Sequence, residues 1–176
     1  MPHPRPARLA ASLATALVLS LAGPPAGAGQ PDAAAAAEHA KPGFYVALED
    51  GRLWVLREGS KELGEFLEHG EPAKQVVRPA AGPGGITLKS VDADTLTEYL
   101  LTRPGFRVEL EDGRLWVFRE GSAELAQFVE QGEPAKQVVR PAAGPGGITL
   151  KSADAETLDA YLAAGDPTGE APARPE

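Results

Sequence analysis

The run Leu48-Glu-Asp-Gly-Arg-Leu-Trp-Val55 decides the fold, because the chain repeats it unchanged from Leu110 to Val117. The match around it covers 62 residues without a gap, so that residues 42–103 align with residues 104–165. Of these 62 positions, 47 are identical. A self-match at a fixed period indicates a tandem duplication. We therefore expect two repeat modules with one architecture.

Each module begins with the pattern of a β-hairpin. Apolar residues alternate with other types before Asp50-Gly51, which is a strong signal for a two-residue turn. Such a turn pairs Leu48 with Leu53 and Val46 with Val55, and it places these four side chains on one core face. A three-residue loop would shift the pairing by one position.

The opposite face of the hairpin carries aromatic residues and is our first candidate for a ligand site. The expected register places Trp54 and Trp116 on it, together with Tyr45, Arg107 and Phe118. An exposed aromatic face can stack on sugars or other flat ligands, and Arg107 could stack on a ring. The alternative is that these aromatic residues are buried in the core or between the modules, as large apolar side chains usually are.

The rest of each module predicts a helix, two strands and a second helix. Ser60 is a suitable N-cap, Gly70 ends the first helix, and Asp92 caps the second. Residues 74–78 and 86–88 have the composition of strands. The simplest arrangement of this ββαββα module is an α+β fold, with a small antiparallel sheet and both helices on one face. The two modules either pack together or are joined by a short tether.

A glycine-rich loop precedes the last strand of each module and is our second candidate for a ligand site. Backbone N–H groups in such loops can bind anions, and basic residues flank this one. The candidate residues are Gly84, Gly85 and Arg78 in the first module, and Gly146, Gly147 and Arg140 in the second. The spacing is not that of a nucleotide-binding P-loop, so a plain hairpin loop is the alternative.

The sequence gives little support for catalysis or metal binding. It contains no Cys, and the position that matches His69 in the second module is Gln131. The Glu49-Asp50 and Glu111-Asp112 pairs lie at hairpin tips, where carboxylates normally stabilise the turn. We therefore expect no enzymatic activity, no metal and no cofactor. A hydrolase or a hydrolase inhibitor remains the remote alternative.

The two ends of the chain differ in composition from the modules. Residues 1–28 have basic residues, an apolar stretch and Ala26-Gly-Ala28, which together are typical of a cleaved secretory signal peptide. Residues 29–41 form an Ala-rich linker, and residues 166–176 form a tail rich in Pro and Gly. Neither segment has large apolar residues to bury, so we expect the linker to be mobile and the tail to be disordered.

The charge of the chain excludes some classes of partner. The net charge is −8, and the loss of the two Arg of the signal lowers it to −10. Such a charge is unfavourable for nucleic acids and for anionic membrane surfaces. We expect an exported protein, periplasmic or secreted, that is not inserted stably in a membrane after cleavage.

The duplication points to binding as the function, because two copies of a binding unit raise avidity. We expect a non-enzymatic binding or interaction protein whose partner is a protein or a glycan of the cell envelope. The alternative is a glycan-binding or small-ligand-binding protein that uses the face with Trp54 and Trp116.

Overall fold

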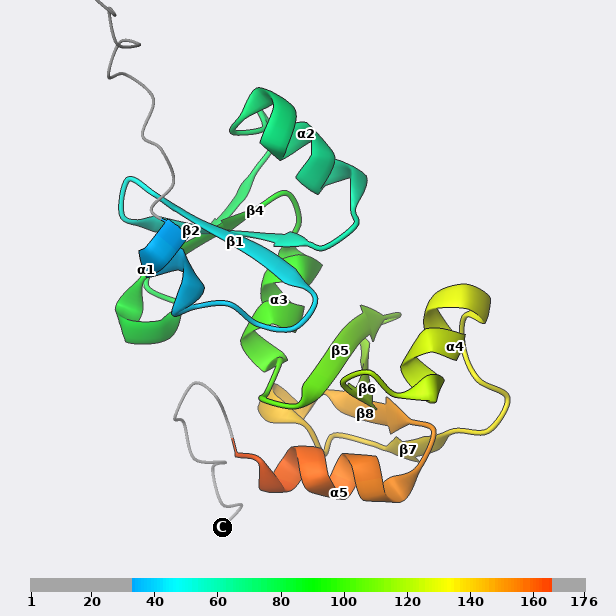
Figure 1. Cartoon of the computed structure of the whole chain (residues 1–176). Helices are drawn as coiled ribbons and strands as arrows, with labels where there is room; N and C mark the ends of the chain where they lie inside the picture. The colour runs from blue at the N-terminus through cyan, green and yellow to red at the C-terminus, as the bar shows by residue number, and fades with distance from the viewer. Residues whose placement is uncertain (1–32, 166–176) are drawn as a thin grey trace, which may run out of the picture.

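The structure is a computed structural model that describes residues 33–165, and each module contains the predicted elements in the predicted order (Figure 1). A short helix comes first, α1 (Ala33–Ala37). The first module comprises β1 (Phe44–Glu49), β2 (Arg52–Arg57), α2 (Lys61–His69), β3 (Val76–Arg78), η1 (Pro83–Gly85), β4 (Thr87–Ser90) and α3 (Ala93–Leu101). The second comprises β5 (Phe106–Glu111), β6 (Arg114–Arg119), α4 (Ala123–Gln131), β7 (Val138–Arg140), η2 (Pro145–Gly147), β8 (Thr149–Ser152) and α5 (Ala155–Ala163). The α+β class and the duplication are therefore confirmed, whereas the predicted signal and tail lie outside the described residues.

The hairpin of each module has the predicted register. Leu48 lies opposite Leu53, and the neighbouring pairs follow in step. Asp50 and Gly51 have φ values of 49° and 70°. Positive φ at both positions is what a two-residue turn of type I′ requires, and Gly adopts it without steric cost. With this register, Trp54 lies on the opposite face of the sheet from Leu53.

The four strands of each module form a mixed sheet, not the antiparallel sheet that we predicted. The strand order is β1-β2-β4-β3 in the first module and β5-β6-β8-β7 in the second. The outer pairs are antiparallel, whereas β2 and β4, and likewise β6 and β8, are parallel. Parallel neighbours need a long crossover connection, and the segment with α2 and β3 provides it.

The two helices of a module lie on opposite faces of its sheet, so the prediction of helices on one face is wrong (Figure 1). On one face, Tyr99 of α3 packs edge-to-face on Phe44, with ring centroids 5.7 Å apart. On the other face, Phe66 of α2 packs on Trp54 at 5.2 Å. The physical reason is the continuous apolar run from Leu53 to Leu56, since a strand with apolar residues at every position is buried on both faces.

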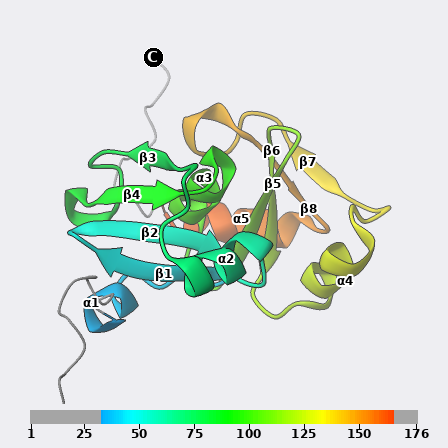
Figure 2. The same cartoon turned by 90° about the horizontal axis from the view of Figure 1, so that it is seen from above.

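The two modules pack together through α3. This helix closes the first module and also lies along β5, the edge strand of the second sheet (Figure 2). The Oε1 atom of Glu98 accepts hydrogen bonds from the Leu110 amide at 2.6 Å and from Arg57 at 2.8 Å. Of the two arrangements considered from the sequence, packed modules or tethered modules, the structure has the packed one.

The Ala-rich segment that begins with α1 is not the mobile linker that we predicted. It lies along β1 as α3 lies along β5. The Tyr99 hydroxyl donates to the His39 carbonyl at 2.8 Å, and 62 residues later the Tyr161 hydroxyl donates to the Leu101 carbonyl at 2.8 Å. Ala36 is only 3% exposed. A small residue can be buried in close contact with a strand, so burial here did not require large apolar side chains.

Candidate binding groove

The predicted aromatic platform is covered in the structure. Trp54 and Trp116 both have an exposed fraction of 0%, because α2 and α4 pack over this face of the sheet. The ring of Phe128 lies 5.3 Å from Trp116 and 4.9 Å from Phe118. Phe118 also stacks nearly parallel to Trp116, with centroids 5.8 Å apart. The indoles are therefore core residues, which is the alternative that the sequence also offered, and they do not form an open stacking surface.

The other two residues of the predicted platform are half-buried and have different surroundings. Tyr45 packs against Phe66 at 6.2 Å, beside α2. Arg107 forms an ion pair with Glu109 at 2.8 Å and lies 5.9 Å from the ring of Phe44, at the junction between the modules. The platform residues thus contribute to packing inside each module and between the modules.

A buried lysine lies over each indole ring. Lys89 is 4% exposed, and its Nζ atom lies 4.4 Å from the ring centroid of Trp54. The same Nζ atom donates to Glu71 at 2.6 Å, and the indole N–H of Trp54 donates to that carboxylate at 3.2 Å. The bond from Lys89 lowers the pKa of Glu71 below its usual range. In the second module Lys151 likewise lies over Trp116 and donates to Glu133, but the buried indole N–H of Trp116 has no hydrogen-bond partner among residues 33–165.

A shallow groove of about 610 Å³ borders the lysine cluster in the second module. It lies beside β6, β8 and β7 on the face that also carries α4. Its lining comprises Arg114, Glu133, Gln137, Val139, Pro141, Thr149 and Lys151. These residues offer hydrogen-bond donors, acceptors and a short apolar strip. Among the described strands, β7 pairs only with β8, so the groove ends at a free sheet edge.

The first module carries identical residues at all the corresponding positions. They are Arg52, Glu71, Gln75, Val77, Pro79, Thr87 and Lys89. Except for the arginine, they lie in a run of 21 consecutive identical positions, Gly70 to Ser90 in the first module and Gly132 to Ser152 in the second. By contrast, five of the nine positions of α2 differ from those of α4.

Burial does not explain this identity. Val77 and Val139 are each 46% exposed, and most of the lining is exposed with them. We take these residues of both modules as the candidate site and call each set of seven a repeat groove. They are not among the site residues predicted from the sequence, although the uninterrupted match of the two segments was a signal that could have found them.

The arginines of the predicted anion site are engaged elsewhere. Arg78 donates to the hydroxyl of Thr97 at 2.8 Å and to the carbonyl of Ala93 at 3.1 Å, which ties β3 to α3. Arg140 forms an ion pair with Asp159 of α5 at 2.6 Å. Both side chains therefore connect a strand to the closing helix of their own module.

The glycines of the predicted anion site are explained by the backbone. Gly84 and Gly85 have φ values of 65° and 78°, and Gly146 and Gly147 have 65° and 77°. The Gly85 amide donates to the Gly82 carbonyl at 3.0 Å, within the loop. Positive φ values require Gly at these positions whatever the loop binds.

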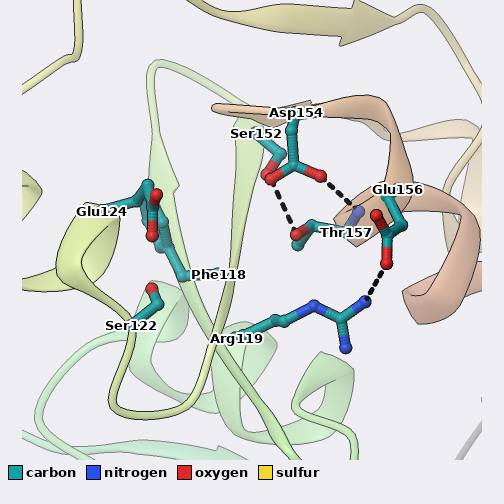
Figure 3. Close-up of a pocket in the computed structure, with 8 residues that line it drawn as sticks. All are labelled: Phe118, Arg119, Ser122, Glu124, Ser152, Asp154, Glu156 and Thr157. Atoms are coloured by element: carbon teal, nitrogen blue, oxygen red, sulfur yellow. Dashed lines mark hydrogen bonds and ion pairs between the residues drawn. The ribbon is translucent and has the colours of Figure 1, made fainter.

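A second hollow, of about 240 Å³, lies between α4 and α5 in the second module (Figure 3). Its polar side chains stabilise local structure. Asp154 accepts from the amide of Thr157 at 2.7 Å and from its hydroxyl at 2.9 Å. Ser122 caps α4, and Arg119 pairs with Glu156 at 3.5 Å. Helix capping therefore accounts for Ser122 and Asp154, and an ion pair accounts for Glu156.

The residues considered for catalysis lie apart from both hollows. His69 is at the exposed end of α2, with Glu68 at 3.7 Å, and Asp50 and Asp112 form hairpin turns. Residues 33–165 contain no group of three or more His, Asp or Glu side chains that could hold a metal ion.

Comparison with protein families, with characterised proteins and with solved structures gives no match to this chain. None of the helices within residues 33–165 has the length and apolar character needed to cross a membrane.

Proposed function

We propose that this chain is an exported, non-enzymatic binding protein that uses its two repeat grooves to hold extended segments of a partner protein in the cell envelope. The observation that carries the proposal is that the residues lining the groove of the second module, exposed ones included, are identical at the corresponding positions of the first module. The modules have diverged on the outer surface of α2 and α4 and at the junction. A surface that stays the same in both modules is best explained by one shared ligand.

The chemistry of the groove favours a polypeptide. An extended peptide can add to a free sheet edge through main-chain hydrogen bonds, while side-chain pockets give specificity. The groove reaches such an edge at β7, and Val139 and Pro141 supply an apolar strip beside it. Arg114 has no ion-pair partner among residues 33–165 and can bind an acidic or carbonyl group of the ligand. The described residues that line the groove include no aromatic ring on which a sugar could stack.

A repeat groove in each module of one chain would make the binding bivalent. Linking two sites raises the overall affinity by roughly 10²- to 10⁴-fold when both can be occupied at once. Partners that carry the recognised segment more than once, or that are fixed in an array, would gain most from this arrangement.

The test is a selection of displayed random peptides on the mature chain, residues 29–176. Val77→Lys and Val139→Lys each place a charge in one groove at an exposed position, so the fold should be retained, which circular dichroism checks. We expect each single variant to bind multivalent peptide more weakly and the double variant to lose binding. Leu67→Lys, which places the same charge at an exposed apolar position of α2 outside the groove, is the matched control.

Two results would overturn the proposal. One is a selection that enriches no peptide, and the other is a set of peptides that binds the double variant as tightly as the wild type. Binding on a glycan array that the double variant retains would instead support the alternative drawn from the sequence.

Export rests on the composition of residues 1–28. When the full chain is produced in a secreting bacterial host, the mature protein should begin at Gly29. N-terminal sequencing of the exported fraction tests this, and a chain that keeps Met1 in the cytoplasm would contradict it.

A further inference from the structure

We propose that Glu98 is a proton-dependent latch between the two modules, which holds α3 against β5 while the carboxyl group is neutral and loosens when it ionises. This inference does not depend on what the repeat grooves bind.

The geometry of the carboxyl group carries the inference. The side chain of Glu98 is 1% exposed, and its Oε1 atom accepts from both Arg57 and the Leu110 amide. Its Oε2 atom is buried and has no hydrogen-bond partner among residues 33–165. A buried carboxylate with one oxygen unsatisfied is costly when it is charged, and a proton on that oxygen removes the charge.

The charges that face Glu98 do not offset this cost. On β2 the facing group is Arg57, which is itself 35% exposed and partly solvated. On β5 the facing groups are Arg107 and Glu109, which pair with one another at 2.8 Å. Burial raises the pKa of Glu98 to about 7, although the bond from Leu110 and the charge of Arg57 act in the opposite direction.

The fold of a module does not require this glutamate. At the equivalent positions, 62 residues away on either side, the chain has Ala36 in α1 and Ala160 in α5. The Leu48 amide, which corresponds to that of Leu110, therefore has Ala36 in place of a glutamate at the equivalent helix position. Glu98 is thus specific to the junction between the modules.

The direction of the pH effect follows from proton linkage. With the junction closed, Glu98 has a pKa of about 7, whereas exposure to water on opening returns it towards the ordinary value of 4.5. Between these values the closed junction binds more protons, so raising the pH favours opening. The opening equilibrium should rise by up to about tenfold per pH unit in this window and should level off above roughly pH 8.

The experiment is amide hydrogen exchange, measured by NMR on the mature chain between pH 5 and 8.5. The protection of the Leu110 amide, corrected for intrinsic rates, is divided by that of Leu48, which serves as the internal control. In the wild type we expect this ratio to fall at least tenfold between pH 5 and 8. In Glu98→Gln, which keeps an acceptor but cannot ionise, the ratio should stay constant.

Either of two outcomes would overturn the latch: the same pH dependence in Glu98→Gln as in the wild type, or a wild-type ratio that rises with pH. If the Gln variant does not fold, Glu98→Ala replaces it, because Ala occupies this position in α1 and α5. Urea unfolding gives a second readout, since the wild type should lose stability relative to either variant as the pH rises from 5 to 8. A gain instead would mean that the ion pair with Arg57 dominates.

Discussion

The two modules differ most where they meet and least where the repeat grooves lie. Three residues at the junction differ from their counterparts in the other module. Arg107 and Glu109 correspond to Tyr45 and Ala47, and Glu98 corresponds to Ala160. In contrast, the segment from Gly70 to Ser90 matches its counterpart at every position. A duplicated unit must adapt to different neighbours at its ends, whereas a shared ligand would keep a surface constant. The comparison therefore distinguishes the residues that join the two modules from the residues that we propose to bind the partner.

The largest effect should come from removing an indole, and it should be unequal in the two modules. We expect Trp54→Ala and Trp116→Ala to lower the free energy of unfolding by about 3–5 kcal/mol each. The loss of stability should be larger for Trp116→Ala, because Trp116 packs on both Phe118 and Phe128. Beside Trp54, the position of Phe118 is taken by Leu56. Urea denaturation followed by far-UV circular dichroism measures both. Losses below about 1 kcal/mol would show that the indoles are not core residues.

The buried lysines should give similar effects in the two modules, since each lies over an indole ring and donates to a glutamate. Lys89→Ala and Lys151→Ala each remove a contact with an indole and a bond to a carboxylate, at an expected cost of about 1–3 kcal/mol. Lys→Met at each position restores the apolar volume and serves as the control for packing. A clear difference between the two sites in thermal unfolding would contradict the equivalence of the clusters.

Loss of the N-cap should destabilise both closing helices, α3 and α5, but only the loss in α3 should also affect the neighbouring module. Asp92→Ala and Asp154→Ala should each cost about 1–2 kcal/mol, because each carboxylate accepts from an amide and from a Thr hydroxyl. Only Asp92→Ala should also lower the exchange protection of the Leu110 amide, since α3 borders the second module. Equal protection of Leu110 in the two variants would argue against α3 as the connecting element.

The smallest effect should be the acid dependence of the lysine clusters, and its sign is opposite to that of Glu98. Hydrogen bonds from Lys89 and Lys151 lower the pKa values of Glu71 and Glu133 below the ordinary value of 4.5. The stabilisation they give is present above that value and is lost as the pH falls through the folded pKa. It should be small, because both carboxylates are half exposed. At pH 6 the wild type should therefore be more stable to urea than the double variant Glu71→Gln and Glu133→Gln, and near pH 2 the two should be equally stable. A difference in stability that does not change with pH would contradict the lowered pKa values of the two carboxylates.

Local patterns predicted the local structure well. The register of the hairpin followed from Asp50-Gly51, and the helix starts followed from Ser60 and Asp92, which cap the helices as expected. These features depend on a few adjacent residues, and their chemistry leaves few alternatives.

The arrangement of the layers was harder to predict, because it depends on distant segments. The run from Leu53 to Leu56 is apolar at every position, which indicates burial on both faces, but an exposed aromatic face was a competing interpretation of the same residues. The repeat groove joins strands that are distant in sequence. Its residues are individually ordinary polar and apolar types that form no recognised motif, so only their recurrence in both modules marked them.

The place of α1 could not be predicted from the repeat at all. Residues 33–41 and 95–103 are 62 positions apart, yet they share no identical residue. They occupy equivalent places because an Ala helix and a larger amphipathic helix can both pack along a strand. Close packing there depends on backbone approach more than on side-chain identity.

The position of α1 has a consequence for where a module can be cut. The first strand of each sheet is covered by a helix that precedes it in the chain, so a fragment that began at Pro42 or Pro104 would present an open strand edge. Such an edge is a template for pairing with another chain and for aggregation. The smallest self-contained fragments should therefore begin with the covering helix, near Ala33 for the first sheet and near Ala93 for the second.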